Sequence, residues 1–181
     1  MEASKYSRIL LKLSGQSFCR PGEFGIDGPS IESIAERISQ ICKIGPQVAV
    51  VVGAGNFLRG KTFSQASHIP RNTADYMGML ATIINACALQ ETLEKLGQPT
   101  RVLSAIEVPA MCECFIRRRA IRHLERGRVA ILAGGTGNPF FTTDTCAALR
   151  ASELDVGLLI KATKVEGVYN DDPEKNPDAQ L

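Results

Sequence analysis

The chain of 181 residues has the length of a single domain, and its composition is that of a soluble globular protein. Hydrophobic residues make up 44% and charged residues 22%, which excludes a disordered or fibrous chain. Lysine plus arginine (21) nearly balance aspartate plus glutamate (19), so the net charge of +2 gives no strong case for nucleic acid. The longest apolar run, residues 48–55, is far shorter than the roughly 18 residues of a membrane span, and the N-terminus lacks a signal-peptide pattern. We therefore expect a cytoplasmic protein with no membrane association.

Cysteine and histidine form no recognisable metal-binding or catalytic pattern. The six cysteines contain no CxxC pair, and His68 and His123 have the wrong spacing for a zinc site. Cys42 and Cys87 fall on apolar helix faces, which is typical of reduced core residues. No protein-bound metal site is expected.

Strands and helices alternate along the chain. Apolar residues at helical spacing predict helices, and β-branched runs such as residues 48–52 predict strands that are covered on both faces. The expected strands are 8–13, 48–52, 101–104, 129–133 and 157–162, the expected helices are 30–43, 73–96, 116–126 and 143–152, and a loop is expected over 16–29. This order predicts an α/β fold with a mostly parallel central sheet and helices on both faces.

The C-terminal segment has the composition of a loop. Residues 170–181 are polar and interrupted by proline. We expect one domain over residues 1–181 that is incomplete at its C-terminus.

Glycine-rich turns follow three of the expected strands, at Ser14-Gly15, residues 53–56 and residues 134–138. The carboxyl ends of parallel strands meet at the ligand-binding edge of a sheet, and glycine lets backbone N–H groups approach a phosphate. One such turn is explained by chain reversal alone. Three at one edge favour anion binding.

One segment matches a known nucleotide-binding pattern without its structural context. Residues 55–62 fit the P-loop pattern GxxxxGK[ST], while an overlapping dinucleotide fingerprint fails because Leu58 stands at its third glycine position. A P-loop must open a helix, but residues 63–72 lack a helical period and contain Pro70. We interpret the match as accidental; the P-loop alternative would make Lys61 essential.

The segment 136–144 brings hydroxyl groups and a carboxylate to the start of an expected helix. Thr142 or Thr143 can cap that helix, and Asp144 falls in its first turn, where it complements the helix dipole. Asp144 can also orient a lysine that neutralises a transferring phosphoryl group. Lys12, at the end of the first strand, is the candidate lysine.

Two further groups leave alternatives open. Asp75 is either a helix-start acid or a carboxylate that accepts the ribose hydroxyls of a nucleotide. Residues 117–128 contain six arginines, which suggests RNA or, because such charge runs are usually exposed, a solvated helix or a subunit contact. A non-catalytic nucleotide- or RNA-binding module therefore remains an alternative to an enzyme.

Taken together, these motifs resemble the bacterial uridylate (UMP) kinases of the amino-acid kinase superfamily. The segments that carry the resemblance are KLSG (12–15), GAGN (53–56) with Arg59-Gly60, DYMGM (75–79), GNPFFTTD (137–144) and KATKVEGVY (161–169). The GTGNPFFTTD stretch is highly specific, whereas the Gly-x-Gly-Asn turn (53–56) and KVEGVY are shared with aspartate and acetylglutamate kinases. Another phosphotransferase of the superfamily is thus a second alternative. The resemblance implies an amino-acid kinase-like α/β/α sandwich whose family pattern continues past Leu181 and completes the ATP side.

The resemblance also implies an activity and its site residues. The reaction would be Mg²⁺-dependent transfer of the ATP γ-phosphoryl group to UMP in pyrimidine biosynthesis, by a cytoplasmic homohexamer that GTP activates and UTP inhibits. Catalytic roles would belong to Lys12, Arg59, Asp144 and Lys161. ATP would contact Lys12, Leu13, Ser14, Gly15, Gly55, Arg59, Thr163, Tyr169 and Asp172. UMP would contact Ala54, Asp75, Thr136, Gly137, Asn138, Pro139, Phe140, Phe141, Thr142 and Thr143. GTP activation would involve Arg20, Pro21, Gly22, Glu23, Phe24 and Gly25.

Three positions depart from the family pattern. Ala54 replaces a glycine and adds a methyl group close to where UMP is expected, Gln16 replaces a glutamate, and Glu166 replaces an aspartate. None of these removes a candidate catalytic group. The scarcity of histidine is no obstacle, because the phosphate of UMP is already ionised near neutral pH and needs no general base.

Overall fold

The computed structural model describes residues 5–58 and 68–162 together with residues 170, 176 and 180. Within these residues, six strands form one parallel sheet in the order β4-β3-β5-β2-β1-β6. The strands are β1 (Arg8–Leu13), β2 (Gln47–Val52), β3 (Thr100–Ser104), β4 (Glu113–Cys114), β5 (Val129–Ala133) and β6 (Leu158–Lys161). The helices are α1 (Gly28–Lys43), α3 (Arg71–Lys95), α4 (Arg117–Glu125) and α5 (Thr143–Glu153), with a 3-10 turn η1 (Gly15–Phe18) after β1.

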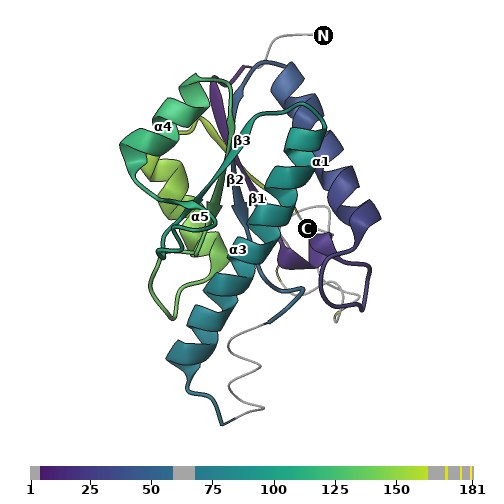
Figure 1. Ribbon diagram of the computed structural model, residues 1–181, viewed down its shortest axis with the longest axis vertical. Coiled ribbons are helices and arrows are strands. Elements are labelled where there is room, and N and C mark those ends of the chain that lie inside the picture. The colour runs from purple at the N-terminus through teal and green to yellow at the C-terminus, as the bar shows by residue number, and fades with distance from the viewer. Residues whose placement is uncertain (1–4, 59–67, 163–169, 171–175, 177–179, 181) are drawn as a thin grey trace.

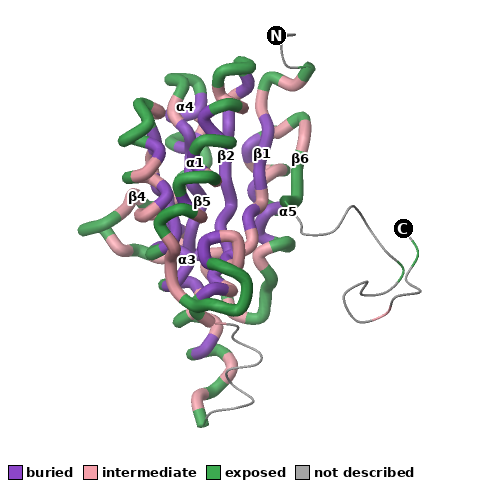
Figure 2. The backbone as a smooth tube through the Cα atoms, turned by 90° about the vertical axis from the view of Figure 1, so that its right-hand side faces the viewer, coloured by how far each residue is buried: buried purple, intermediate pink, exposed green. Residues whose placement is uncertain are grey.

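Helices cover both faces of the sheet, with α1 and α3 on one side and α4 and α5 on the other (Figure 1). Successive strand residues point to opposite faces. Leu11 of β1 accordingly joins the core under α1 and α3, while its neighbour Leu10 joins the core under α4 and α5. Because both faces are covered, the central strands β2 and β5 are apolar except for Gln47, and they are mostly buried, as Figure 2 shows. The predicted α/β fold class is confirmed.

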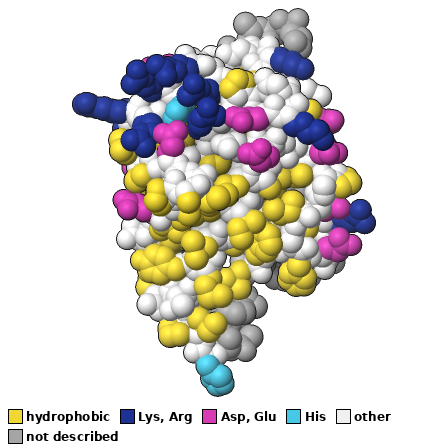
Figure 3. Space-filling model, viewed as in Figure 1, with side chains coloured by type: hydrophobic (Ala, Val, Ile, Leu, Met, Phe, Trp, Pro, Cys, Tyr) yellow, Lys and Arg dark blue, Asp and Glu magenta, His cyan; other side chains and the backbone are white. Residues whose placement is uncertain are grey.

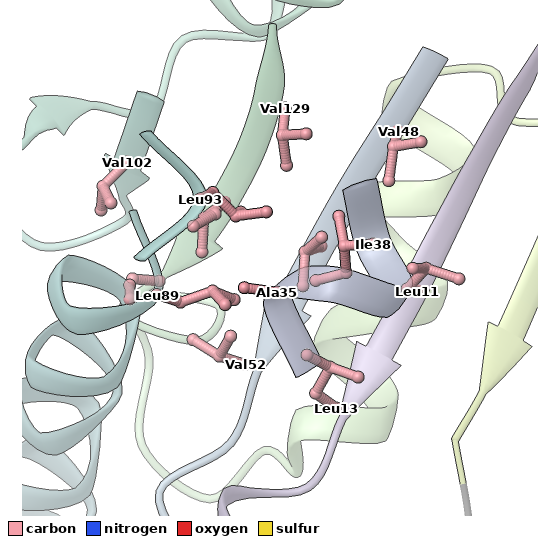
Figure 4. Packing of buried hydrophobic residues seen from close by; sticks show 14 of the residues in the cluster. Leu11, Leu13, Ala35, Ile38, Val48, Val52, Leu89, Leu93, Val102 and Val129 are labelled. Carbon is pink, nitrogen blue, oxygen red and sulfur yellow. The ribbon is translucent and has the colours of Figure 1, made fainter. Parts of the chain in front are cut away.

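The larger core fixes α3 against the sheet. Leu89 and Leu93 of α3 and Ile38 of α1 are at most 2% exposed and point toward the strands (Figure 4). Burial of each such side chain stabilises the fold by about 1.5–3 kcal/mol. The N-terminal turns of α3 extend beyond the carboxyl ends of the strands (Figure 1). The helix is thereby held at one end and borders the candidate site at the other.

The start of α1 lies two residues before the predicted position. Asp27 caps the helix, since its Oδ2 accepts a hydrogen bond from the Ser30 amide at 3.0 Å. Pro29 fits the first turn, where a missing N–H has no cost. The expected loop over 16–29 is therefore shorter and begins with η1.

The strand β4 was not predicted. It has only two residues and shows no alternation of its own. Its register is set by β3, with Leu103 opposite Glu113 and Ser104 opposite Cys114. Tertiary pairing, and not local pattern, makes it a strand.

No helix in the described part of the chain combines the length and apolarity that are needed to cross a bilayer. The extension of the domain past residue 162 stays a prediction.

Candidate functional site

A cavity of about 550 Å³ opens at the carboxyl edge of the sheet, where the three glycine turns meet. Its lining comes from four places: the end of β1 and η1, the turn after β2, the first half of α3, and the segment after β5. The residues concerned include Lys12, Gly15, Gly53, Ala54, Gly55, Asp75, Thr82, Gly135, Thr136, Asn138, Phe141, Thr142, Thr143 and Asp144. Segments more than 120 residues apart in sequence are therefore neighbours in this cavity.

A larger cavity of about 850 Å³ lies between α1 and the strands β1 and β6. It shares Lys12 and Ser14 with the first cavity, but otherwise it is lined mainly by aliphatic side chains such as Ile34 and Ile160. The charged and glycine-rich groups converge in the smaller cavity, so the chemistry is assigned there.

Asp144 joins two lysines. Its Oδ1 lies 2.7 Å from Lys12 Nζ, and its Oδ2 lies 2.8 Å from Lys161 Nζ. Burial disfavours the charged carboxylate, but the hydrogen bonds and charges of the two lysines outweigh it, so the pKa of Asp144 lies below its usual value. The Lys12 side chain is only 12% exposed, whereas that of Lys161 is 56% exposed. The cluster therefore holds one inner and one outer cation around one carboxylate.

Gly15 packs directly against the turn after β2. A Cβ atom at this position would lie 2.2 Å from the Gly55 nitrogen and 2.7 Å from the Ala54 carbonyl carbon. No side chain fits there, so a glycine is required by close backbone approach. Two of the glycine turns thus touch through their backbones.

Asp75 ties α3 to the segment after β5. Its Oδ1 accepts a hydrogen bond from Arg71 Nε, and its Oδ2 accepts one from the Phe140 amide, both at 2.8 Å. Phe140 has a φ of +73°, a conformation that costs a non-glycine residue about 1–3 kcal/mol. The bond to Asp75 supports that backbone. Each carboxylate oxygen keeps a second lone pair that a ligand can use.

The segment between β5 and α5 is built as a polar, exposed turn. Thr142 is the N-cap of α5 and accepts a hydrogen bond from the Thr145 amide at 3.1 Å, as one of the two capping alternatives predicts. Gly134 and Gly137 have positive φ values of 73° and 81°. Phe140 and Phe141 are 66% and 58% exposed. These features leave hydroxyls and aromatic rings at the mouth of the cavity.

The predicted catalytic, ATP and UMP residues fall into four groups. Three residues of the segment after β5, Gly137, Pro139 and Phe140, line neither of the two cavities. Lys12, Ser14, Gly15, Ala54, Gly55, Asp75, Thr136, Asn138, Phe141, Thr142, Thr143 and Asp144 line the smaller cavity. Leu13 and Lys161 line the larger one, and Lys161 also reaches Asp144. Arg59, Thr163, Tyr169 and Asp172, together with Lys61 of the P-loop alternative, lie outside the described residues.

The predicted effector segment, residues 20–25, does not line the smaller cavity. It is largely exposed, with Phe24 83% exposed, and Arg20 Nε lies 3.0 Å from Asp27 Oδ1. Its direct link to the site is Gly25, whose amide donates to the Asn56 carbonyl at 2.9 Å and whose carbonyl accepts from Asn56 Nδ2 at 2.7 Å.

The sequence reasoning missed three contributors to the site. Arg71 holds Asp75, while Thr82 and Asn85 contact the glycine turns from inside α3. A signal was available for the last two. Both are polar residues on the face of α3 that is otherwise occupied by core residues such as Leu89.

The arginines of residues 117–128 gather over α4 on the surface, away from the glycine turns (Figure 3). Several are engaged with neighbours: Arg119 lies 3.5 Å from Glu113, Arg117 donates to the Glu153 carbonyl, and an Arg128 nitrogen lies 3.1 Å from His123 Nδ1. These contacts fit a solvated helix as well as a protein contact.

Among the residues that the structure describes, no three His, Cys, Asp or Glu side chains are grouped as metal ligands. All six cysteines are free thiols. Burial raises the pKa of the Cys42 thiol to about 11 and also raises that of Cys146.

Comparison with known proteins identifies the family. The model of the amino acid kinase family matches residues 7–181. The chain belongs to the amino acid kinase family. Within the family it belongs with the uridylate kinases: it is 56% identical to those of Xanthomonas axonopodis pv. citri and Xanthomonas euvesicatoria pv. vesicatoria over 179 residues, which is 99% of this chain and 74% of each relative.

Solved structures of UMP kinases agree with this assignment. The UMP kinase of Bacillus anthracis superposes with a TM-score of 0.91 at 36% identity and covers 98% of this chain and 73% of its own. The UMP kinase of Ureaplasma parvum gives 0.89 at 38% identity, with 98% and 75% coverage. An isopentenyl phosphate kinase is similar at the level of fold alone, with a TM-score of 0.67 and 21% identity.

Proposed function

We propose that this chain transfers the γ-phosphoryl group of ATP to UMP and produces ADP and UDP. The observation that carries the proposal is the pair of lysines around Asp144, set between glycine turns in a chain that is 56% identical to uridylate kinases. An anionic oxygen of the UMP phosphate attacks the γ-phosphorus. The bond from that phosphorus to the bridging oxygen breaks, and ADP leaves with the electron pair.

The site residues divide between the two substrates. The negative charge of the two aligned substrate phosphates is neutralised by Lys12, Lys161 and Arg59. Asp144 keeps the two lysines in place. Ser14, Gly15 and Gly55 hold the ATP phosphates through short side chains and backbone. Asp75 and the segment 136–143 hold UMP, with Ala54 beside it. Thr163, Tyr169 and Asp172 complete the ATP side.

Mg²⁺ fits this arrangement as part of the ATP complex. Both oxygens of Asp144 are already occupied by lysines, and Mg²⁺ in kinase sites keeps several waters and binds largely through substrate phosphates. When bound, the ion neutralises charge on those phosphates. Asp144 and Asp75 are the carboxylates that line the cavity, and the second lone pair of each of their oxygens would be available to the hydration shell of the ion.

We further propose that GTP activates and UTP inhibits the enzyme, in a cytoplasmic homohexamer that serves pyrimidine nucleotide biosynthesis. The link from Gly25 to Asn56 gives the effector segment 20–25 a path to the site. Free thiols are typical of a reducing compartment. An assembly surface is offered by α3, along which hydrophobic side chains gather (Figure 3); Leu80 and Ile84 are 49% and 52% exposed.

The test is ADP release from Mg-ATP with UMP, CMP, dTMP, aspartate and acetylglutamate offered separately. We expect turnover with UMP alone. Lys12→Ala is expected to lower kcat about 10²- to 10³-fold, because one group that stabilises the transition-state charge is lost. Lys43→Ala, at the exposed end of α1, is the control and is expected to behave as wild type.

Other outcomes would reject the proposal. Turnover with an amino-acid acceptor but not with UMP would assign another activity of the family. Full activity of Lys12→Ala, with loss on Lys61→Ala, would restore the P-loop alternative. Salt-dependent RNA affinity in a chain that binds no UMP would favour the binding-module alternative.

A further inference from the structure

Two buried polar side chains on α3 touch the turns on opposite sides of the cavity. Thr82 is 5% exposed and Asn85 is 0% exposed. Residues three apart share one helix face. Their polar atoms are hydrogen-bonded to the Gly53 carbonyl, the Asn56 side-chain amide and the Gly134 backbone amide, and not to core side chains.

Thr82 holds the start of the segment that leads from β5 toward α5. Its hydroxyl donates to the Met79 carbonyl at 2.6 Å and accepts from the Gly134 amide at 2.8 Å. Because a hydroxyl has one hydrogen, the first bond directs its lone pairs toward Gly134. The position of Gly134 is tightly confined, because a Cβ atom there would lie 2.7 Å from Ser104 Oγ and 3.0 Å from the Ala105 nitrogen.

Asn85 holds both ends of the turn after β2. Its Nδ2 donates to the Gly53 carbonyl and to Asn56 Oδ1, both at 2.8 Å, and its Oδ1 accepts from Asn56 Nδ2 at 2.9 Å. The two amides are therefore paired reciprocally. Ala54 and Gly55, between these ends, are left to line the cavity.

We propose that Thr82 and Asn85 are positioning residues, which set the separation of the two turns that hold the substrates; this rests on the proposed function. Core packing alone does not account for them, because burying an amide and a hydroxyl costs free energy that an apolar pair of similar size would not cost. Among the described residues, every hydrogen-bond partner of Thr82 and Asn85 outside α3 lies in one of these two turns. Since Leu89 and Leu93 fix the same helix in the core, α3 acts as a rigid spacer between the turns.

The two residues have different expected effects. Thr82 supports only the side assigned to UMP, whereas Asn85 supports the turn that lies between both substrates. A general loss of stability would affect both nucleotides alike in either variant. Selective weakening of UMP binding is therefore the signature of positioning by Thr82.

The test compares Thr82→Val, which keeps the shape and loses the hydroxyl, with Thr82→Ser, which keeps the hydroxyl. Thr92→Val is the matched control, because the Thr92 hydroxyl also donates to a carbonyl of the preceding turn of α3, that of Ala88 at 2.8 Å, but contacts neither glycine turn. We expect Thr82→Val to raise the Kd of UMP about fivefold, as loss of one buried hydrogen bond predicts, and to leave the Kd of Mg-ADP within about twofold. Thr82→Ser should recover most of the UMP affinity. Calorimetric titration of the full chain gives both constants.

A second readout does not depend on any ligand. In the free chain, hydrogen exchange at the Gly134 amide is expected to accelerate about fivefold in Thr82→Val and to return toward wild type in Thr82→Ser. Asn85→Ala should weaken the binding of both UMP and Mg-ADP. If this variant does not fold, the Thr82 variants alone test the positioning role.

Three results would overturn the positioning role: unchanged Gly134 exchange in Thr82→Val, unchanged UMP affinity despite faster exchange, or equal loss in Thr92→Val. Wild-type chain that binds no UMP would reject the proposed function, and in that case the exchange data alone decide whether Thr82 holds the turn.

Discussion

Gly15→Ala is a sharp test of the site geometry, because it adds one methyl group at the contact between two glycine turns. The new Cβ would lie 2.2 Å from the Gly55 nitrogen and 2.7 Å from Asn56 Oδ1. Ordinary contacts begin at 3.4 Å, so the turn after β2 must recede by roughly 1 Å. Overpacking of this kind costs about 1–3 kcal/mol. For a chain of this size that corresponds to a fall in melting temperature of about 2–12 °C.

The effect on function should exceed the effect on stability. A displacement of about 1 Å in a catalytic arrangement can cost 10²-fold in rate. We therefore expect Gly15→Ala to remain folded at 25 °C and to lose about 10²-fold in kcat/KM for ATP. The assays are thermal unfolding by circular dichroism and ADP release with UMP as acceptor.

Gly28→Ala is the control for this experiment. Gly28 lies in the first turn of α1, and a Cβ there meets no atom within 4 Å, so alanine should be neutral or slightly stabilising. Wild-type melting temperature and kcat/KM in Gly15→Ala would refute the reasoning, because they would mean that the two turns are not in contact. Equal losses of melting temperature and kcat/KM in both variants would show that any glycine-to-alanine change in this region is harmful. The contact between the two turns would then not be the cause.

Two further predictions concern titration and thiol chemistry. Because the folded pKa of Asp144 lies below its ordinary value of 3.8, its ion pairs stabilise the fold fully above that pH and are lost only as the pH falls through the lower, folded-state pKa. The difference in urea-unfolding free energy between wild type and Asp144→Asn should then be constant above about pH 5 and shrink only below pH 3.8. Asp155→Asn is the control. A difference that disappears between pH 7 and 5 would contradict the assignment of the lowered pKa to Asp144. Cys42, whose thiol has a pKa of about 11 because of burial, should react slowly with Ellman's reagent at pH 8, and the exposed Cys114 should give the fast phase. A fast phase that persists in Cys114→Ser would show that a different thiol is accessible.

Local pattern was sufficient for most of the fold. The run of β-branched residues in β2 and the apolar positions of α1, such as Ile31, Ala35 and Ile38, have the periods of a buried strand and an amphipathic helix. These periods arise from backbone geometry within a few residues, so they can be read without knowing the partner. Helix starts were less accurate, because Asp27 and Pro29 determine the start of α1 together.

Long-range pairing was not readable in this way. Strand β4 is a strand only because Leu103 and Ser104 supply its partners, and the order of the six strands depends on which apolar faces meet. The two cavities likewise arise from packing between distant segments.

The candidate site shows the same division. The identity of its chemical groups was visible in the sequence, since glycine turns at strand ends with a strand-end lysine are typical of phosphate binding, and a helix-start carboxylate can orient that lysine. Only the tertiary structure brought Asp144 between Lys12 and Lys161, and only it gave Thr82 and Asn85 partners 52 and 32 residues away. The physical reason is that a hydrogen bond between distant segments leaves no periodic trace in the chain, whereas a turn or a helix face does. The sequence by itself thus determined the elements and the chemical groups, and the packing of α3 against the sheet decided how those groups are spaced.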